Sequence, residues 1–241
     1  MFTSRMASAA SAAVVGACIV VGSVFLVSAW GSAPPSTLAA TSSPITSHGA
    51  SDNPPAAQAT STSPSTISGV YGDPVAAAKY WQQQSLEDNC GLVSVADVVG
   101  EITGHEPTEQ QMITLGESTP SQTNPGPIYA ARDDPSHADG NGGIEMADEV
   151  VLLDHYGIKS EMTYAAHPEQ TGLPALERYL ADDRKVIAWV NSAIIWNTND
   201  QRTKADHFLV VTGIDTNKEI VHLNDPGADH ADEQVTITAF T

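Results

Sequence analysis

Hydrophobic and polar positions divide the chain into three parts. Residues 7–30 form an uncharged run of apolar and small side chains, residues 31–70 are mostly Ser, Thr, Pro and Ala, and the remainder mixes apolar and polar positions as a globular domain does. An apolar run of this length can cross a bilayer as a helix, because a span needs about 20 residues. We therefore expect a signal peptide or a signal-anchor transmembrane helix over residues 1–30, a disordered linker over 31–70, and one folded domain over 71–241.

Within the folded domain, the clearest helical pattern begins at Cys90. The apolar positions after it, among them Leu92, Val95 and Val99, recur at steps of three and four, which places them on one face of a helix. Gly104 is expected to end this helix. Similar patterns predict further helices over 108–115, 144–156 and 173–180, and strands over 158–163, 186–190, 207–214 and 219–225. The Pro-, Asp- and Gly-rich stretch 120–143 is predicted to be a long loop, and it is a candidate flap over a substrate cleft.

The order of these elements predicts the fold class. Helices precede the main strands, and a turn at 215–218 joins the last two strands into a hairpin. This order favours an α+β fold in which N-terminal helices pack on an antiparallel sheet.

Charge narrows the range of functions. The formal net charge is −19, and all but one of the basic residues, Arg5, follow the linker. Such a surface repels nucleic acid and anionic lipid, so we expect no nucleic-acid partner. A group of acidic and amide residues in the long loop could suggest calcium, but it lacks the regular spacing of a calcium loop. We read it as a solvated acidic loop, and expect no metal and no cofactor; the group comprises Asp133, Asp134, Asp139 and Asn141.

Cys90 is the one cysteine outside the apolar run. An exported domain that uses cysteine for stability uses it in pairs, so a lone thiol is either a small buried side chain or a reactive group. The helix pattern places Cys90 at a helix N-terminus, where unpaired backbone N–H groups and the helix dipole stabilise an anion. The thiolate is the nucleophilic form of cysteine, and the same N–H groups can bind the oxyanion formed on an attacked carbonyl. Gln84, six residues upstream, could complete that oxyanion hole.

His207 is the strongest candidate for the base. It opens an apolar run that has the pattern of a buried strand, where an imidazole is costly unless it is hydrogen-bonded. The predicted hairpin returns Asn224 and Asp225 towards it. Successive residues of a strand face opposite sides, so one of these two can orient the imidazole. Asp206 should point away from His207, and His222 is read as an ordinary strand residue.

Together these residues resemble the papain-like cysteine peptidases of family 39, the bacteriocin-processing or double-glycine type. The resemblance covers about residues 71–240 and rests on Gln84 with Asn89-Cys90-Gly91, on Asp206-His207-Phe208-Leu209-Val210-Val211-Thr212-Gly213, and on Leu223-Asn224-Asp225-Pro226. It implies a papain-like fold, a nucleophile at Cys90, a base at His207, an orienting Asp225 and an oxyanion-hole Gln84. The best-known members are fused to an export transporter and cut leader peptides inside the cell, whereas we expect this domain outside the cytoplasm, so their substrate does not carry over.

The sequence leaves three functional readings open. The first is an exported cysteine peptidase, secreted or membrane-anchored, that acts on a peptide or protein substrate. The second is a cell-wall peptide amidase or transpeptidase that uses the same cysteine. The third is a catalytically inactive, surface-displayed binding module. The oligomeric state, the substrate and the cleavage preference do not follow from the sequence.

Overall fold

The computed structural model describes residues 25–30, 69–130, 133–135, 143–164, 166–167 and 169–241, the first of these ranges by its backbone alone. The expected targeting segment up to residue 24 and most of the expected linker lie outside the described residues. In the described part, no helix combines the length and the hydropathy that crossing a bilayer requires. After the linker, the described chain resumes at residue 69 and enters strand β2 at Val70–Gly72.

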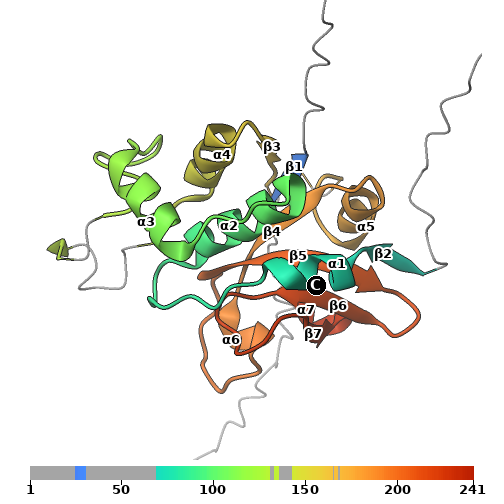
Figure 1. Ribbon diagram of the computed structural model, residues 1–241. Helices are drawn as coiled ribbons and strands as arrows, with labels where there is room; N and C mark the ends of the chain where they lie inside the picture. Colours follow the sequence, from blue (N-terminus) through green and yellow to red (C-terminus); the bar gives the residue numbers. More distant parts are fainter. Residues whose placement is uncertain (1–24, 31–68, 131–132, 136–142, 165, 168) are drawn as a thin grey trace, which may run out of the picture.

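The domain is built on one antiparallel sheet, which confirms the predicted α+β class (Figure 1). Its strands run in the order β3-β1-β4-β5-β6-β7, and β2 pairs with the last residues of β5, beyond the start of β4. The bounds are β1 Phe25–Trp30, β3 Lys159–Met162, β4 Lys185–Val190, β5 His207–Asp215, β6 Ile220–Asn224 and β7 Glu233–Thr236. Strand β1 was not expected, because its residues end the apolar run that predicted a targeting segment; it hydrogen-bonds between β3 and β4.

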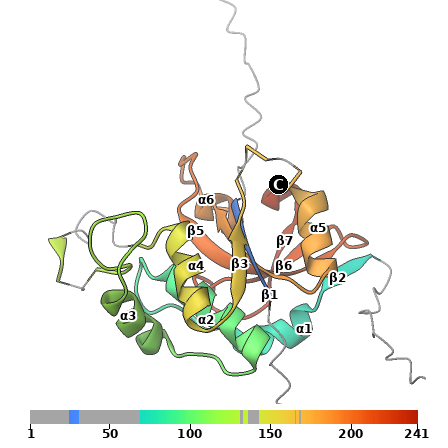
Figure 2. The same ribbon diagram turned by 90° about the horizontal axis from the view of Figure 1, so that it is seen from above.

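Helices cover both faces of the sheet (Figure 2). On one face lie α2 (Cys90–Thr103), α3 (Glu109–Ser118) and α4 (Met146–His155), packed on Phe208 and Val210 of β5. On the other face lie α5 (Leu173–Ala181) and α7 (Ile237–Phe240), packed on the alternate residues Leu209 and Val211. Because both faces of β5 are buried, its middle is a continuous apolar run, Phe208 to Val211.

Helix α2 ends, and helix α3 begins, where the sequence predicts. Helix α2 ends at Gly104, which has a φ of 76° and a backbone N–H that donates to the carbonyl of Gly100. Helix α3 begins with a capping box in which Thr108 and Gln111 exchange hydrogen bonds. The short helices α1 (Pro74–Ala77), η1 (Ala78–Tyr80) and α6 (Ser192–Ile195) were not predicted, and neither was β7.

The predicted hairpin joins β5 to β6. The carboxylate of Asp215 accepts hydrogen bonds from the backbone N–H groups of Asn217 and Lys218, at 3.0 and 3.1 Å, and so holds the turn. The register pairs Val210 with Asn224, and it brings the end of β6 back beside the start of β5. This return places Asp225 next to His207.

Candidate active site

Cys90 is the first residue of α2 and is a buried free thiol, 8% exposed. The backbone N–H of Phe208, on β5, donates to its sulfur at 3.5 Å. The first intrahelical bond of this turn runs from the N–H of Val93 to the carbonyl of Asn89, at 3.1 Å. The N–H groups of the preceding residues belong to the unpaired first turn of the helix. They give the thiol an electropositive setting, and the first turn carries no acidic side chain.

The base and its orienter are in direct contact. The Nε2 atom of His207 lies 2.6 Å from Oδ1 of Asp225, and both side chains are almost completely buried. The imidazole also lies close enough to the side chain of Cys90 for their interaction to raise the pKa of His207. Because Nε2 faces Asp225, Nδ1 is the nitrogen left for the thiol. The structure therefore resolves the choice between Asn224 and Asp225 as the residue that faces the imidazole. Asn224 points instead to Ala77 and Asp97, with its Nδ2 atom 2.9 Å from the carbonyl oxygen and 2.7 Å from the carboxylate.

These contacts set the charge of the pair. Burial alone would lower the pKa of His207, but hydrogen bonds to Asp225 and Cys90, together with their charges, outweigh it and raise the pKa to about 10. Burial acts to raise the pKa of Asp225, yet the bonds and charge of His207 and the Trp196 N–H lower it. His207 therefore carries a proton at neutral pH beside an ionised Asp225.

Two tryptophans that the sequence reasoning missed hold Asp225. The indole N–H of Trp196 donates to Oδ2 of Asp225 at 2.8 Å, and its ring packs on His207 with centroids 5.0 Å apart. The indole N–H of Trp81 donates to the main-chain oxygen of Asp225 at 2.6 Å. The backbone N–H of Gly227 also donates to Oδ1, at 2.7 Å. The carboxylate is thus fixed before any substrate binds.

Gln84 lies beside this group, on a segment tied to the chain after Asp225. Its backbone N–H donates to the carbonyl of Pro226 at 2.9 Å, and the side chain of Gln83 donates to the carbonyl of Ala228 at 3.0 Å. The amide nitrogen of Gln84 donates to the carbonyl of Leu86 at 2.6 Å. An amide NH₂ carries two hydrogens, and this bond uses one of them.

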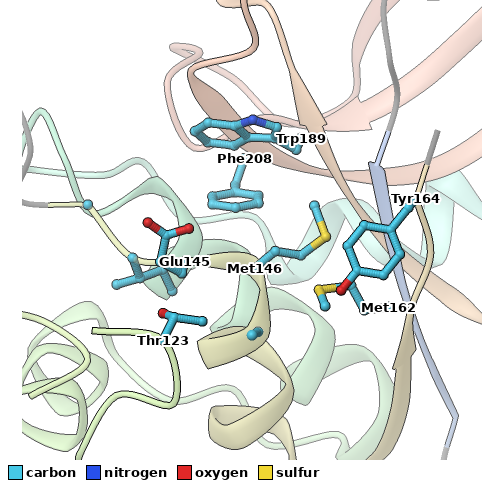
Figure 3. Close-up of a pocket in the computed structure, with 10 residues that line it drawn as sticks. Thr123, Glu145, Met146, Met162, Tyr164, Trp189 and Phe208 are labelled. Carbon is cyan, nitrogen blue, oxygen red and sulfur yellow. The ribbon is translucent and has the colours of Figure 1, made fainter. Parts of the chain in front are cut away.

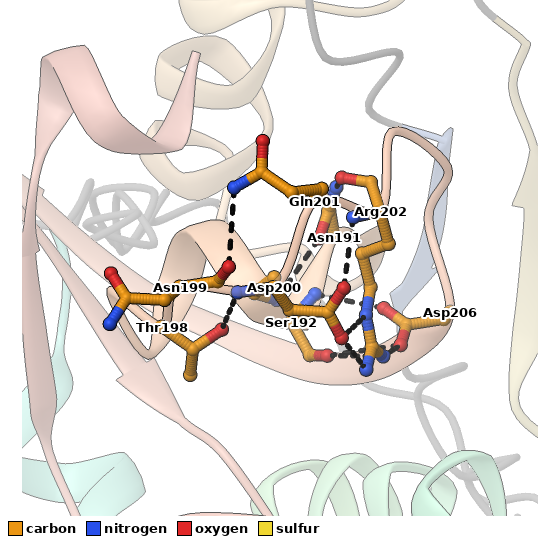
Figure 4. Close-up of polar contacts among 9 residues, drawn as sticks. Asn191, Ser192, Thr198, Asn199, Asp200, Gln201, Arg202 and Asp206 are labelled. Carbon is orange, nitrogen blue, oxygen red and sulfur yellow. Dashed lines mark hydrogen bonds and ion pairs between the residues drawn. The ribbon is translucent and has the colours of Figure 1, made fainter.

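A pocket of about 490 Å³, which we call the imidazole pocket, opens at this point and is bordered by Gln84, Trp196, Arg202 and His207. Arg202 forms ion pairs with Asp200 and Asp206, and Asp206 also accepts from the backbone N–H and hydroxyl of Ser192, at 2.9 and 3.0 Å (Figure 4). This network braces the loop between α6 and β5, which carries Trp196 at one end and leads into His207 at the other.

Glu109, at the start of α3, holds the segment that leads into the nucleophile. One of its oxygens accepts from the backbone N–H of Ser85 at 2.6 Å and from the side chain of Asn89 at 2.7 Å. Burial opposes ionisation of this carboxyl, but the hydrogen bonds from Ser85 and Asn89 lower its pKa. The residue before Cys90 is therefore anchored to a second helix.

Other polar residues that the sequence singled out lie elsewhere. Asp206 was expected to point away from His207, and it pairs with Arg202; His222 pairs with Asp232 at 2.6 Å. Of the acidic loop, Asp139 and Asn141 lie outside the described residues, and within the part of the chain that is described no group of three or more His, Cys, Asp or Glu side chains could hold a metal ion.

The sequence of this chain matches a family model and several known proteins. A family model described as Peptidase_C39 like family matches residues 81–241. An uncharacterized protein of Mycobacterium tuberculosis strain H37Rv is 42% identical over 176 residues, which cover 68% of this chain and 75% of that protein. An uncharacterized protein of Mycobacterium bovis matches with the same identity and coverage. No solved structure matches the chain at a significant level.

Proposed function

The chain belongs to the Peptidase_C39 like family, and we propose that it is a cysteine peptidase in which Cys90, His207 and Asp225 form the triad. The observation that carries this proposal is the contact chain from the thiol of Cys90 through the imidazole of His207 to Asp225, at the N-terminus of a buried helix. Nucleophile, base and orienting group within hydrogen-bond reach are what covalent catalysis by a thiol requires.

The reaction follows from the placement of these groups. Cys90 and His207 react as a thiolate–imidazolium pair, in which the thiol proton already resides on Nδ1 of His207, and the thiolate sulfur attacks the carbonyl carbon of the scissile peptide bond. The resulting oxyanion accepts hydrogen bonds from the backbone N–H groups at the start of α2 and from the second N–H of Gln84. His207 then gives its proton to the leaving amine, and the C–N bond breaks. Water, deprotonated by the same imidazole, attacks the thioester; the C–S bond breaks, the acid product leaves, and the thiolate–imidazolium pair is restored.

Cleavage of a peptide mixture tests this proposal. Peptides from a digested proteome, incubated with the full chain, should show new termini that are absent with Cys90→Ser and with His207→Ala. A His222→Ala variant is the matched control, because it removes another buried, carboxylate-paired imidazole outside the triad. If Cys90→Ser produces the same new termini as the parent, the proposal is wrong. If no protein, the parent included, cleaves any peptide, the binding-module reading replaces it.

We also propose that the domain is exported, because residues 7–30 are apolar and the flanking charge, Arg5, is N-terminal to them. Strand β1 limits where the segment can be cut, since cleavage after Phe25 would remove part of a strand that pairs with β3 and β4. N-terminal sequencing of the exported protein checks this. A mature terminus at or before Phe25, or an uncut segment, agrees with the strand, whereas a terminus beyond Trp30 does not.

A further inference from the structure

A carboxyl group that the proposed mechanism does not use, that of Glu233, lies beside the orienting carboxylate. Glu233 opens β7, and the register of the sheet places it opposite Leu223 of β6. Alternate residues of a strand share a face, so Leu223 and Asp225, which directly follows β6, point to the same side as Glu233. Diagonal neighbours on one face of a sheet are within reach of long side chains. The sheet therefore brings a second carboxyl group to the residue that orients His207.

This face of the sheet is the one on which Leu223 and α7 pack. A pocket of about 540 Å³ that Phe208 lines opens on the other face, towards α4 (Figure 3). Glu145, the one charged group among the described residues of its lining, is therefore separated from Glu233 by the sheet. Helices α6 and α7 carry no titratable side chain, and α5 packs on β4 and β5 instead of β7. The charges that act on Glu233 therefore come from the neighbouring strands and loops.

The carboxylate of Asp225 has room for one more donor. Its Oδ1 atom accepts from His207 and from the backbone N–H of Gly227, and its Oδ2 atom accepts from Trp196. A carboxylate has about four acceptor positions, so one on Oδ2 is left by these three contacts. The Oε2 atom of Glu233 is buried and has no hydrogen-bond partner in the described part of the chain. A proton on Glu233 satisfies both groups at once, because the acid can then donate to Asp225.

The surroundings of Glu233 move its ionisation to neutral pH. Burial is the largest influence, and the interaction with the neighbouring Asp225 acts in the same direction, so that the pKa of Glu233 is raised to about 7. The charges of His230 and His207 oppose this rise in pKa. His230 lies in the loop before β7, where its Nδ1 atom is 2.6 Å from the carboxylate of Asp229. The second carboxyl group thus gains or loses its proton in the pH range in which most proteins work.

We infer that Glu233 is a positioning residue that makes the hold of Asp225 on His207 depend on pH. This inference rests on the proposed peptidase function. The protonated acid donates a hydrogen bond to Asp225 and draws negative charge away from the imidazole. The ionised form, which has given its proton to solvent, instead adds a second negative charge near His207. Ionisation of Glu233 therefore stabilises the imidazolium, and with it the thiolate of Cys90, so the thiol becomes more reactive as Glu233 loses its proton.

Carbon-13 NMR of the glutamate carboxyl groups, in the full chain labelled at glutamate, tests the contact itself. The resonance that is missing from Glu233→Gln identifies Glu233. Its titration midpoint should lie near pH 7 in the parent, and about one pH unit or more lower in Asp225→Asn, because the neighbouring negative charge is gone. A parental midpoint near the usual glutamate value of about 4.3, or a midpoint that Asp225→Asn leaves unchanged, would overturn the inference.

The rate at which iodoacetamide alkylates Cys90 in the full chain tests the effect on the nucleophile. The amide of Glu233→Gln can donate to Asp225 at every pH and never ionises. The ratio of the parental rate to the rate of this variant should therefore be close to one at pH 5.5 and rise to about threefold or more at pH 8. Iodoacetamide reports on the thiolate alone, so the readout does not depend on how well a substrate binds.

A matched control and a second variant separate the possible outcomes. Glu106 is also a half-buried glutamate with a raised pKa, but it accepts a hydrogen bond from Gln82, so the parental rate divided by the Glu106→Gln rate should not change with pH. If the ratio for Glu233→Gln is equally constant while His207→Ala is slow, the positioning role is refuted and the peptidase proposal stands. If the parent and His207→Ala react equally at every pH, both fail.

Discussion

Asp225 lies 2.6 Å from the Nε2 atom of His207 and holds that imidazole in its protonated form. Asp225 is itself held by three donors: the indole of Trp196 and the main-chain N–H of Gly227 bond its carboxylate, and the indole of Trp81 bonds its main-chain carbonyl. The pair is therefore assembled within the folded chain. Its consequences for stability and for reactivity can be measured separately.

The His207–Asp225 pair makes stability depend on pH. An unfolded imidazole has a pKa of about 6.5, whereas that of His207 is raised to about 10. The folded state binds the proton more tightly, so the stabilisation is fully present below about pH 6.5 and is lost as the pH rises to about 10. The difference in unfolding free energy between the parent and His207→Gln, measured with urea, should shrink by the order of a few kcal/mol across this window. A difference that is constant from pH 6 to pH 10 would contradict the prediction. His222→Gln, measured in parallel, is the control: it shows any pH dependence of stability that does not come from the His207–Asp225 pair.

Trp196 should act on the reaction through Asp225. Trp196→Phe keeps a ring against His207 but removes the donor to Oδ2. A hydrogen bond to a charged group contributes about 1.5–3 kcal/mol, so kcat should fall about tenfold or more. KM should change little. The pH at which activity is half-maximal should shift, and this readout is diagnostic since a structural defect alone would leave that pH unchanged. Parental kcat with an unchanged pH profile would show that the indole N–H does not position the carboxylate.

Glu149 should destabilise the protein as the pH rises. The side chain is fully buried in α4, and neither of its oxygens has a hydrogen-bond partner in the described part of the chain. Burial raises its pKa well above the usual value, and the charges of the nearby Cys90 and Asp148 raise that pKa further. A raised carboxyl pKa favours folding at low pH, and this contribution declines from about pH 4.3 upward, by up to about 1.4 kcal/mol per pH unit. Glu149→Gln should therefore be more stable than the parent at pH 8, and the gain should diminish towards pH 4.

A neighbouring carboxyl provides the control for that measurement. Asp148 accepts hydrogen bonds from the hydroxyl of Ser121 at 2.7 Å and from the backbone N–H of Gln122 at 2.8 Å. Asp148→Asn should lower stability, because it weakens a partnered site rather than relieving an unpartnered one. If Glu149→Gln lowers stability at pH 8 as much as Asp148→Asn does, then the carboxyl of Glu149 has a partner in solution and the account of it is wrong.

The sequence predicted those parts of the fold in which local pattern and burial agree. Helix α2 could be predicted because its apolar positions lie in the core and Gly104 adopts the left-handed conformation that ends it, although the helix is buried all round from Cys90 to Gly100 and not on one face alone. Strand β5 was readable because both of its faces are covered. Strand β7 was missed because its polar sequence, Glu-Gln-Val-Thr, buries one side chain at the edge of the sheet.

The site was partly readable for a similar reason. Cys90, His207 and Asp225 begin or end predicted elements. The predicted hairpin brought Asn224 and Asp225 towards His207, and the resemblance to family 39 selected Asp225 and grouped it with Cys90. The role of Trp196 could not be predicted from the sequence, because it depends on a contact with Asp225, 29 positions away. Trp196 ends a short helix that has no strong sequence pattern. Glu149 was missed because a helix pattern does not reveal that a carboxylate faces another helix. The expected targeting segment ends in β1, whose pairing with β3 and β4 depends on strands more than 100 residues away.

The most direct test of the central claim is the rate at which iodoacetamide alkylates Cys90 in the full chain, followed by the mass of the Cys90 peptide between pH 5 and pH 9. We predict rapid alkylation at pH 6 in the parent and in His222→Ala, and a rate lower by about tenfold or more in His207→Ala, because the imidazolium no longer stabilises the thiolate. Equal rates in the parent and in His207→Ala at every pH would show that no thiolate–imidazolium pair forms, and the proposed peptidase would lose its chemical basis.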